Sequence, residues 1–186
     1  LSHFYEQQAT YLLQRCLCFL PFVDPPSTGI ARIKEVIAER RFLDYELREV
    51  VQALGHSRSS DAFELLIELA RTGGNRFQAF AMEWIEAMAD LDIPESKRVL
   101  MSFVDPDTQQ LGVEQYFEHH NRERLASHVV GIARAESAVR ERLYVLCNRE
   151  LSQSKRMLLA QVISELGTPD GALAGLNLIH DDASPA

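Results

Sequence analysis

The apolar residues of this chain recur at helical spacing almost from end to end. The clearest stretch is 75–91, where apolar side chains follow an i, i+3, i+4, i+7 pattern and most charged side chains fall on the other side. Its apolar members are Phe77, Phe80, Ala81, Trp84, Ile85, Met88 and Leu91. No segment shows the sustained apolar and polar alternation of a half-buried strand. The pattern therefore predicts an all-α protein.

Turn residues divide the chain into short helices. Gly55, Gly73-Gly74 and Gly167 are expected helix ends, because glycine accepts the left-handed conformation that often closes a helix. Asp105-Pro106 and Thr168-Pro169 place a capping side chain before a proline, as at a helix start. We expect about eleven helices joined by short turns, which favours antiparallel neighbours. They are expected near residues 5–20, 29–40, 43–55, 60–72, 75–91, 95–104, 107–118, 121–134, 137–149, 153–166 and 169–180.

Composition and charge narrow the functional classes. The 186 residues are 46% apolar and 25% charged, which is typical of a folded protein. The chain carries 19 Lys and Arg residues against 27 Asp and Glu residues, a formal net charge of −8. Because the nucleic-acid backbone is also negative, we expect that nucleic acid is not the partner.

Cysteine usage and hydropathy bear on the compartment. Cys16, Cys18 and Cys147 make an odd number without metal-binding spacing, which indicates reduced thiols and a cytoplasmic location. No apolar run approaches the roughly 18 residues that a membrane-spanning helix needs, so we expect no membrane association.

Two parts of the chain resemble each other weakly. Residues 45–55 end in Ala-Leu-Gly and lead into 60–66, and residues 155–167 end in Glu-Leu-Gly and lead into 168–173. A shorter motif, Phe-Val-Asp-Pro, occurs at 22–25 and again at 103–106. Short helices with short turns and a recurring segment are typical of helical repeat proteins.

These segments resemble HEAT repeats, especially the short HEAT-like type of bacterial scaffold and lyase proteins. The family pattern is a helix, an Asp-Pro-like turn and a second helix that opens with Val-Arg and closes with Ala-Leu-Gly. Val139-Arg140 also fits that opening. The resemblance implies an α-α superhelix (solenoid) of about five stacked antiparallel helix pairs, with an armadillo-like array as the alternative. It also implies that a protein partner binds along the concave solenoid surface.

The resemblance suggests a domain organisation. We expect an N-terminal capping helix over residues 1–20, a HEAT-like repeat array over 21–180 and a flexible C-terminal tail over 181–186. Because the chain begins at Leu1 rather than Met, we expect it to be a segment of a larger bacterial protein. We expect a monomer or weak self-association.

Two groups of side chains have both a structural and a functional interpretation. The arginines near helix starts are expected to reach acidic turn residues or carbonyls rather than a ligand. They are Arg48, Arg76, Arg140 and Arg156. Phe77, Phe80 and Trp84 have the chemistry of a platform for stacking bases, but their spacing on an amphipathic helix favours core packing.

The segment around residue 120 is the candidate partner-binding site. Its members are Tyr116, His119, His120 and Arg124, close to an expected helix junction. His120 and His128 are too far apart to share a metal ion, and Arg124 between them would repel a cation. The HEAT-like family includes an iron hydroxylase built on His-Glu pairs, but no His in this chain is followed by Glu. We therefore expect no metal site.

The sequence contains no nucleophile elbow, phosphate-binding loop or dinucleotide fingerprint. Neighbouring carboxylates such as Asp105 and Asp107 are interpreted as turn residues rather than as an acid–base pair. We therefore expect a non-catalytic protein–protein interaction scaffold without a cofactor. Two alternatives are a HEAT-like repeat enzyme of the alkyl-DNA glycosylase or bilin lyase type, and a self-assembling structural module.

Overall fold

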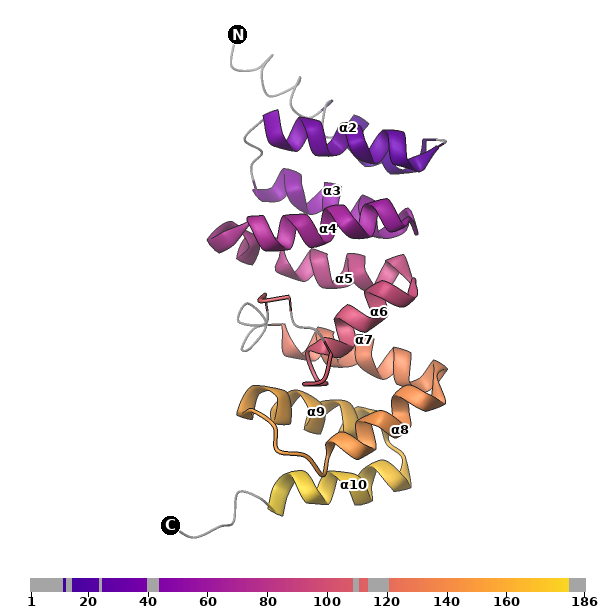
Figure 1. Cartoon of the computed structure of the whole chain (residues 1–186), viewed down its shortest axis with the longest axis vertical. Helices are drawn as coiled ribbons and strands as arrows, with labels where there is room; N and C mark the ends of the chain where they lie inside the picture. Colours follow the sequence, from indigo (N-terminus) through magenta and orange to yellow (C-terminus); the bar gives the residue numbers. More distant parts are fainter. Residues whose placement is uncertain are drawn as a thin grey trace. The chain divides into compact units, whose positions relative to one another are not determined.

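The computed structural model describes residues 12, 15–23, 25–39, 44–108, 111–113 and 121–180, apart from the side chains of residues 45, 179 and 180. Every regular element in these ranges is a helix, which confirms the all-α prediction for this part of the chain (Figure 1). Within the same ranges no helix is both long and apolar enough to cross a membrane. The chain divides into two compact units, Leu1–Ser96 (unit 1) and Lys97–Ala186 (unit 2).

In unit 1, helices that are two apart in the sequence pack against each other. The pairs are α3 on α5 and α2 on α4. The elements are η1 (Leu20–Phe22), α2 (Pro26–Glu39), α3 (Asp44–His56), α4 (Ser60–Thr72), η2 (Gly74–Ala79) and α5 (Ala81–Leu91), and α6 (Pro94–Ser102) contains the boundary between the units. Each short amphipathic helix has one apolar face, which it can bury only against neighbouring helices.

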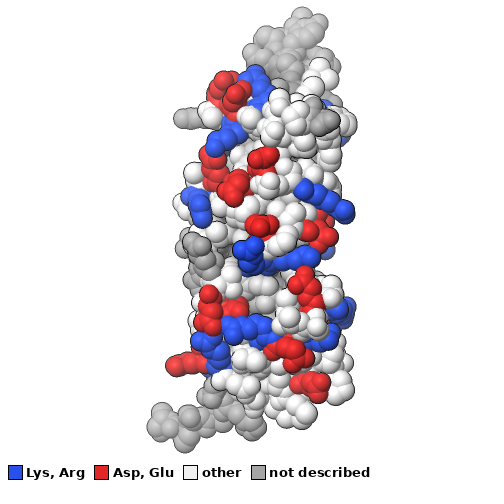
Figure 2. All heavy atoms as spheres, turned by 45° about the vertical axis from the view of Figure 1, so that its right-hand side comes forward, with Lys and Arg blue, Asp and Glu red and all other residues white. Residues whose placement is uncertain are grey.

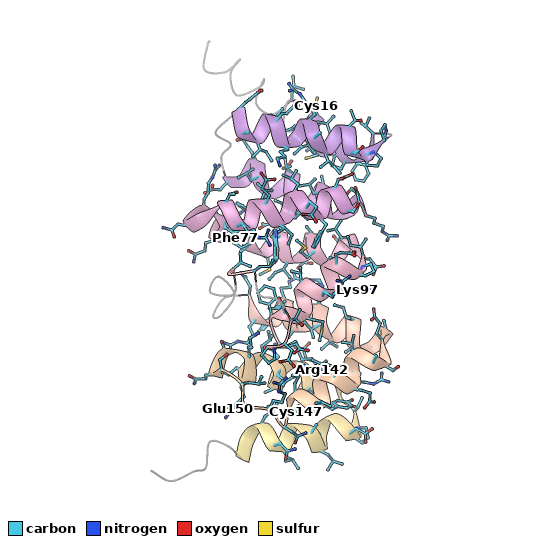
Figure 3. All side chains as sticks on the ribbon, in the orientation of Figure 1. Cys16, Phe77, Lys97, Arg142, Cys147 and Glu150 are labelled. Carbon is cyan, nitrogen blue, oxygen red and sulfur yellow. The ribbon has the colours of Figure 1, made fainter. Side chains whose placement is uncertain are left out.

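Trp84 lies in the core of unit 1. Its side chain is fully buried, and its indole Nε1 donates a hydrogen bond of 2.8 Å to the backbone carbonyl of Leu66 in α4. The ring of Phe77, labelled in Figure 3, meets Phe80 and Trp84 edge to face, with centroids 5.2 and 5.6 Å away. The prediction that these aromatic residues form core rather than a stacking platform is confirmed.

The prediction of a single helix over 75–91 is wrong for residues 75–80. The chain forms the 3₁₀ helix η2 and leaves helical geometry at Phe80 (φ −129°, ψ 16°) before α5 begins. Phe77, before the break, and Trp84, after it, both point into the same core and touch. Tertiary packing of the aromatic rings therefore overrides the local helical periodicity.

The backbones of α3 and α5 approach closely at Gly55. A Cβ atom on Gly55 would lie 2.5 Å from the Cα and 2.8 Å from the Cβ of Ala87, closer than real atoms come. The helix continues one residue past Gly55 to His56, so the predicted helix end is placed to within one residue and Gly55 lies in the last turn. Glycine is needed there because it has no side chain to separate the two helices.

Unit 2 repeats the packing of helices two apart. Its helices are α7 (Arg122–Ala135), α8 (Ser137–Leu146), α9 (Gln153–Leu166) and α10 (Pro169–His180), with α7 on α9 and α8 on α10 (Figure 1). Gly167 closes α9 in the left-handed region (φ 64°), and the Oγ1 of Thr168 accepts from the N–H of Gly171 at 3.1 Å. The predicted end of one helix and start of the next are thus confirmed.

The prediction of a helix near 107–118 is wrong for the residues that the structure describes there. Residues 107–108 form a turn, and residues 111–113 are irregular. The Oδ1 of Asp105 does accept the N–H of Asp107 at 3.0 Å, as a helix cap would. The same carboxylate is held by Arg142 of α8, and the chain turns instead of continuing as a helix.

The segments that resemble HEAT repeats form two helix pairs, α3–α4 and α9–α10, each joined by a short turn. The Phe-Val-Asp-Pro motif is not equivalent in its two copies, because Phe22 and Val23 are exposed whereas Phe103 and Val104 are buried. Residues 12 and 15–19 of the expected capping helix are helical, and the expected tail lies outside the described residues. The superhelix of about five pairs stays a prediction.

We expect Trp84→Ala to lower the free energy of unfolding of unit 1 by about 3–5 kcal/mol, because it leaves a cavity and removes the hydrogen bond to Leu66. Urea unfolding followed by circular dichroism at 222 nm measures the change. Val23→Ala shortens an exposed side chain of the same unit and should shift the free energy by less than about 0.5 kcal/mol. An unchanged midpoint for Trp84→Ala would place that side chain at the surface.

Gly55→Ala should destabilise unit 1 by about 1–3 kcal/mol, because the new methyl group must push α3 and α5 apart. The matched control is Gly131→Ala in α7, where a Cβ atom would meet nothing within 4 Å. This control should stabilise its helix by about 0.5–1 kcal/mol, the ordinary preference for alanine over glycine. Equal stabilisation by both substitutions, measured by thermal unfolding, would contradict the close approach at Gly55.

Candidate protein-binding surface

The structure describes one of the four residues predicted to bind a partner. Arg124 lies on the exposed face of α7. Tyr116, His119 and His120 lie outside the described residues. The grouping of these four side chains therefore stays a prediction.

Few described groups have the character of a reactive centre. Wherever the structure describes the chain, no three or more His, Cys, Asp or Glu side chains are placed to hold a metal ion. Burial raises the pKa of the Cys147 thiol to about 11, so it stays protonated and a weak nucleophile at neutral pH. Burial, and to a smaller extent Glu49, also raises the pKa of Cys18.

Two of the predicted structural arginines bind as expected. Arg48 donates from Nε to the carbonyl of Ala79 at 2.8 Å and lies 3.5 Å from Glu83. Arg76 donates from Nε to Asp44 at 2.9 Å. These contacts join α3 to η2 and α5, which confirms the structural interpretation for both residues. For Arg140 and Arg156 it stays a prediction.

A network of ion pairs holds the turn that follows α6. Arg142 of α8 binds Asp105 through both carboxylate oxygens, at 2.7 Å from Nε and 2.8 Å from Nη2. Its Nη2 also donates to Asp107 at 2.6 Å, and Arg149 donates to the same Asp107 oxygen. Figure 3 labels Arg142 within unit 2. Lys155 of α9 adds a bond of 2.6 Å to the carbonyl of Ser102.

This network makes the two aspartates structural. Hydrogen bonds from Arg142 lower the pKa of Asp105, and hydrogen bonds from Arg149 and Arg142 lower the pKa of Asp107. Both carboxyls are therefore ionised at neutral pH, whereas an efficient general acid or base has a pKa near the working pH. The arrangement agrees with their interpretation as turn residues.

A groove opens between α9 and α10. Its volume is about 620 Å³, and most of its lining is apolar or small. The lining residues are Ala160, Ile163, Ser164, Gly167, Thr168, Pro169, Gly171, Ala172, Gly175, Leu176 and Leu178. A Cβ atom on Gly175 would lie 3.3 Å from the Cγ2 of Ile163, so glycine brings the α10 backbone close to α9. The Oγ1 of Thr168 is already bonded to Tyr144 at 2.6 Å.

The outer side of α10 carries exposed leucines beside this groove. Leu173 and Leu176 are 68% and 52% exposed, although leucine is usually buried. Asp170 is the only Asp, Glu, Lys or Arg residue in Pro169–His180. We call the groove together with these two leucines the α9–α10 face. Sequence reasoning missed it, although a helix with two leucines three apart and a single charge is a readable signal.

Charges elsewhere are mixed in sign. Residues 1–96 carry nine Lys and Arg residues against fifteen Asp and Glu, and residues 97–186 carry ten against twelve. On the side shown in Figure 2, positive and negative side chains of each unit lie next to one another. Neither sign gathers into a broad patch on that side, so it lacks the basic stripe expected of a nucleic-acid-binding surface.

We expect Arg142→Gln to lower the free energy of unfolding of unit 2 by about 1–3 kcal/mol, because the nearly buried Asp105 carboxylate loses its bidentate partner. The control Arg32→Gln removes an exposed pair with Glu35 and should leave the unfolding curve unchanged.

The stability that the ion pair between Asp105 and Arg142 adds to unit 2 should depend on pH. The folded protein lowers the pKa of Asp105. The contribution of its ion pair to the free energy of unfolding is therefore complete above the ordinary carboxyl pKa of about 4. That contribution is lost as the pH falls through the lowered pKa of the folded state. Wild type and Asp105→Asn should therefore converge in stability at strongly acidic pH. A difference that grows below pH 4 would contradict the role of the ion pair.

Comparison of the chain with protein-family models, curated proteins and solved structures gave no match. The resemblance to HEAT repeats therefore stays a prediction from the sequence segments described above.

Proposed function

We propose that this chain is a non-catalytic helical-repeat module of the HEAT-like type that binds protein partners. The observation that carries the proposal is the α9–α10 face, where exposed Leu173 and Leu176 adjoin an open apolar groove. Large apolar side chains that border a groove commonly mark protein-interaction sites. The helix pairs α3–α4 and α9–α10, which carry the resemblance to HEAT repeats, support the repeat interpretation.

The chemistry of the face favours a protein over other partners. A nucleic-acid backbone requires basic side chains, and the groove lining contains no Lys or Arg. A small-molecule site usually has a few converging polar groups, whereas Thr168 already bonds Tyr144 and the N–H of Gly171. An apolar helix of another protein would match the groove in polarity.

The enzyme alternative has less support from the described residues. A glycosylase needs an acidic catalytic residue beside a basic concave surface. Asp105, the least exposed of the described aspartates, is bound by both oxygens to Arg142. Phe77, Phe80 and Trp84 are core residues, so they do not offer rings to a base.

Affinity capture with matched variants tests the proposal. Three tagged baits are prepared: the wild-type chain, Leu176→Asp and Val23→Asp. Each bait is incubated with a lysate to which untagged chain has been added, so that a second copy is among the proteins it can retain. We expect the wild type and Val23→Asp to retain the same protein, and Leu176→Asp to lose it, because a charge at the α9–α10 face prevents apolar contact. Val23 is an exposed apolar residue of unit 1, so it controls for the loss of surface hydrophobicity. Identical retention by all three baits would count against this face as the binding site.

A further inference from the structure

We propose that Met157 is a methionine oxidation site, at which a peroxide forms a sulfoxide that binds Arg122 and ties α9 to α7. The inference is independent of the proposed function, because neither residue lines the α9–α10 groove. It depends on two observations: the exposure of Met157 and the contact between its sulfur and a guanidinium group.

Met157 is the most exposed of the four methionines in the chain. It is 38% exposed, whereas Met88 is 0% and Met101 is 9% exposed. Met82 is half-buried. A peroxide must reach the sulfur in order to react with it, so we expect Met157 to be oxidised first.

The sulfur of Met157 already has a hydrogen-bond donor beside it. Arg122, the first residue of α7, donates from Nη1 to the Sδ of Met157 at 3.7 Å. A thioether sulfur is only a weak acceptor, so this contact is weak in the reduced protein. Because α7 and α9 pack against each other within unit 2, the two side chains stay close together.

Oxidation turns this weak acceptor into a strong one. A lone pair of Sδ attacks one oxygen of hydrogen peroxide, the O–O bond breaks, and the second oxygen leaves as water. The sulfur thereby loses two electrons and the peroxide gains them. The product has a polar sulfoxide oxygen, which can form a charge-assisted hydrogen bond with the guanidinium of Arg122. The unbranched methionine side chain has three rotatable bonds, so it can shift to place that oxygen against Nη1.

The consequence differs from that of oxidation in a core. A sulfoxide at the fully buried Met88 would place a polar group inside unit 1 and destabilise it. At Met157 the same change leaves the core of unit 2 intact and strengthens a contact between two helices. Because sulfoxide reductases restore the thioether, the stronger contact is reversible.

Peptide mapping by mass spectrometry after limited treatment with hydrogen peroxide tests the site of reaction. A thiol reductant added afterwards reverses the mild oxidation of cysteines. We expect sulfoxide to accumulate several-fold faster at Met157 than at Met82, and more slowly still at Met88 and Met101. Oxidation of any other methionine ahead of Met157 would overturn the inference.

Thermal unfolding tests the bond to Arg122. Wild type and Arg122→Leu are each compared before and after oxidation of Met157; any other contact of Arg122 is lost in both states of the variant and cancels. The change in unfolding temperature on oxidation should be more positive in wild type than in Arg122→Leu, by about 1–3 °C. A methionine sulfoxide reductase should reverse it.

Met157→Leu is the matched control, because it keeps a similar volume but has no sulfur. The same peroxide treatment should leave its unfolding temperature unchanged, and circular dichroism confirms that each variant is folded. An equal change on oxidation in wild type and Arg122→Leu, or a more negative one in wild type, would show that the sulfoxide does not bind Arg122 and would overturn the inference.

Discussion

The architecture depends on one constraint: a short amphipathic helix has a single apolar face and must bury it against helices nearby in the chain. In unit 1 the apolar faces of α3 and α5 pack together, and Gly55 leaves room there for Ala87. The Trp84 side chain of α5 also donates a hydrogen bond to the backbone of α4. In unit 2 it is met by α7 on α9 and α8 on α10. The same constraint makes the α9–α10 face notable, since there an apolar surface has no helix covering it among the described residues.

Several charged side chains of the described residues join separate elements. Arg142 and Arg149 tie the turn at Asp105 and Asp107 to the α8 region, and Arg76 ties η2 to Asp44 at the start of α3. Ion pairs of this kind orient segments and add modest stability where they are exposed. The lining of the α9–α10 groove and the exposed Leu173 and Leu176 carry no such charged group.

Local signals predicted several features well. Gly167 and Thr168-Pro169 place the end of α9 and the start of α10, because a left-handed glycine and a cap to the N–H of Gly171 are local features. The break at Phe80 and the turn at Asp105 were not predictable in this way, since one depends on aromatic packing and the other on Arg142, 37 residues later. The α9–α10 face was missed because periodicity shows which side of a helix is apolar but not whether a neighbour covers it. The predicted partner site is testable in the described residues only through Arg124, which is exposed.

Hydrogen–deuterium exchange of the chain alone and with the captured protein tests the central claim, that the α9–α10 face is a protein contact. Amides of α10 should exchange more slowly with the partner bound, because binding suppresses local opening of that helix. Amides of α3 and α5 should exchange at the same rate in both samples. Equal exchange of α10 in both samples, at partner concentrations that saturate the chain, would contradict the account.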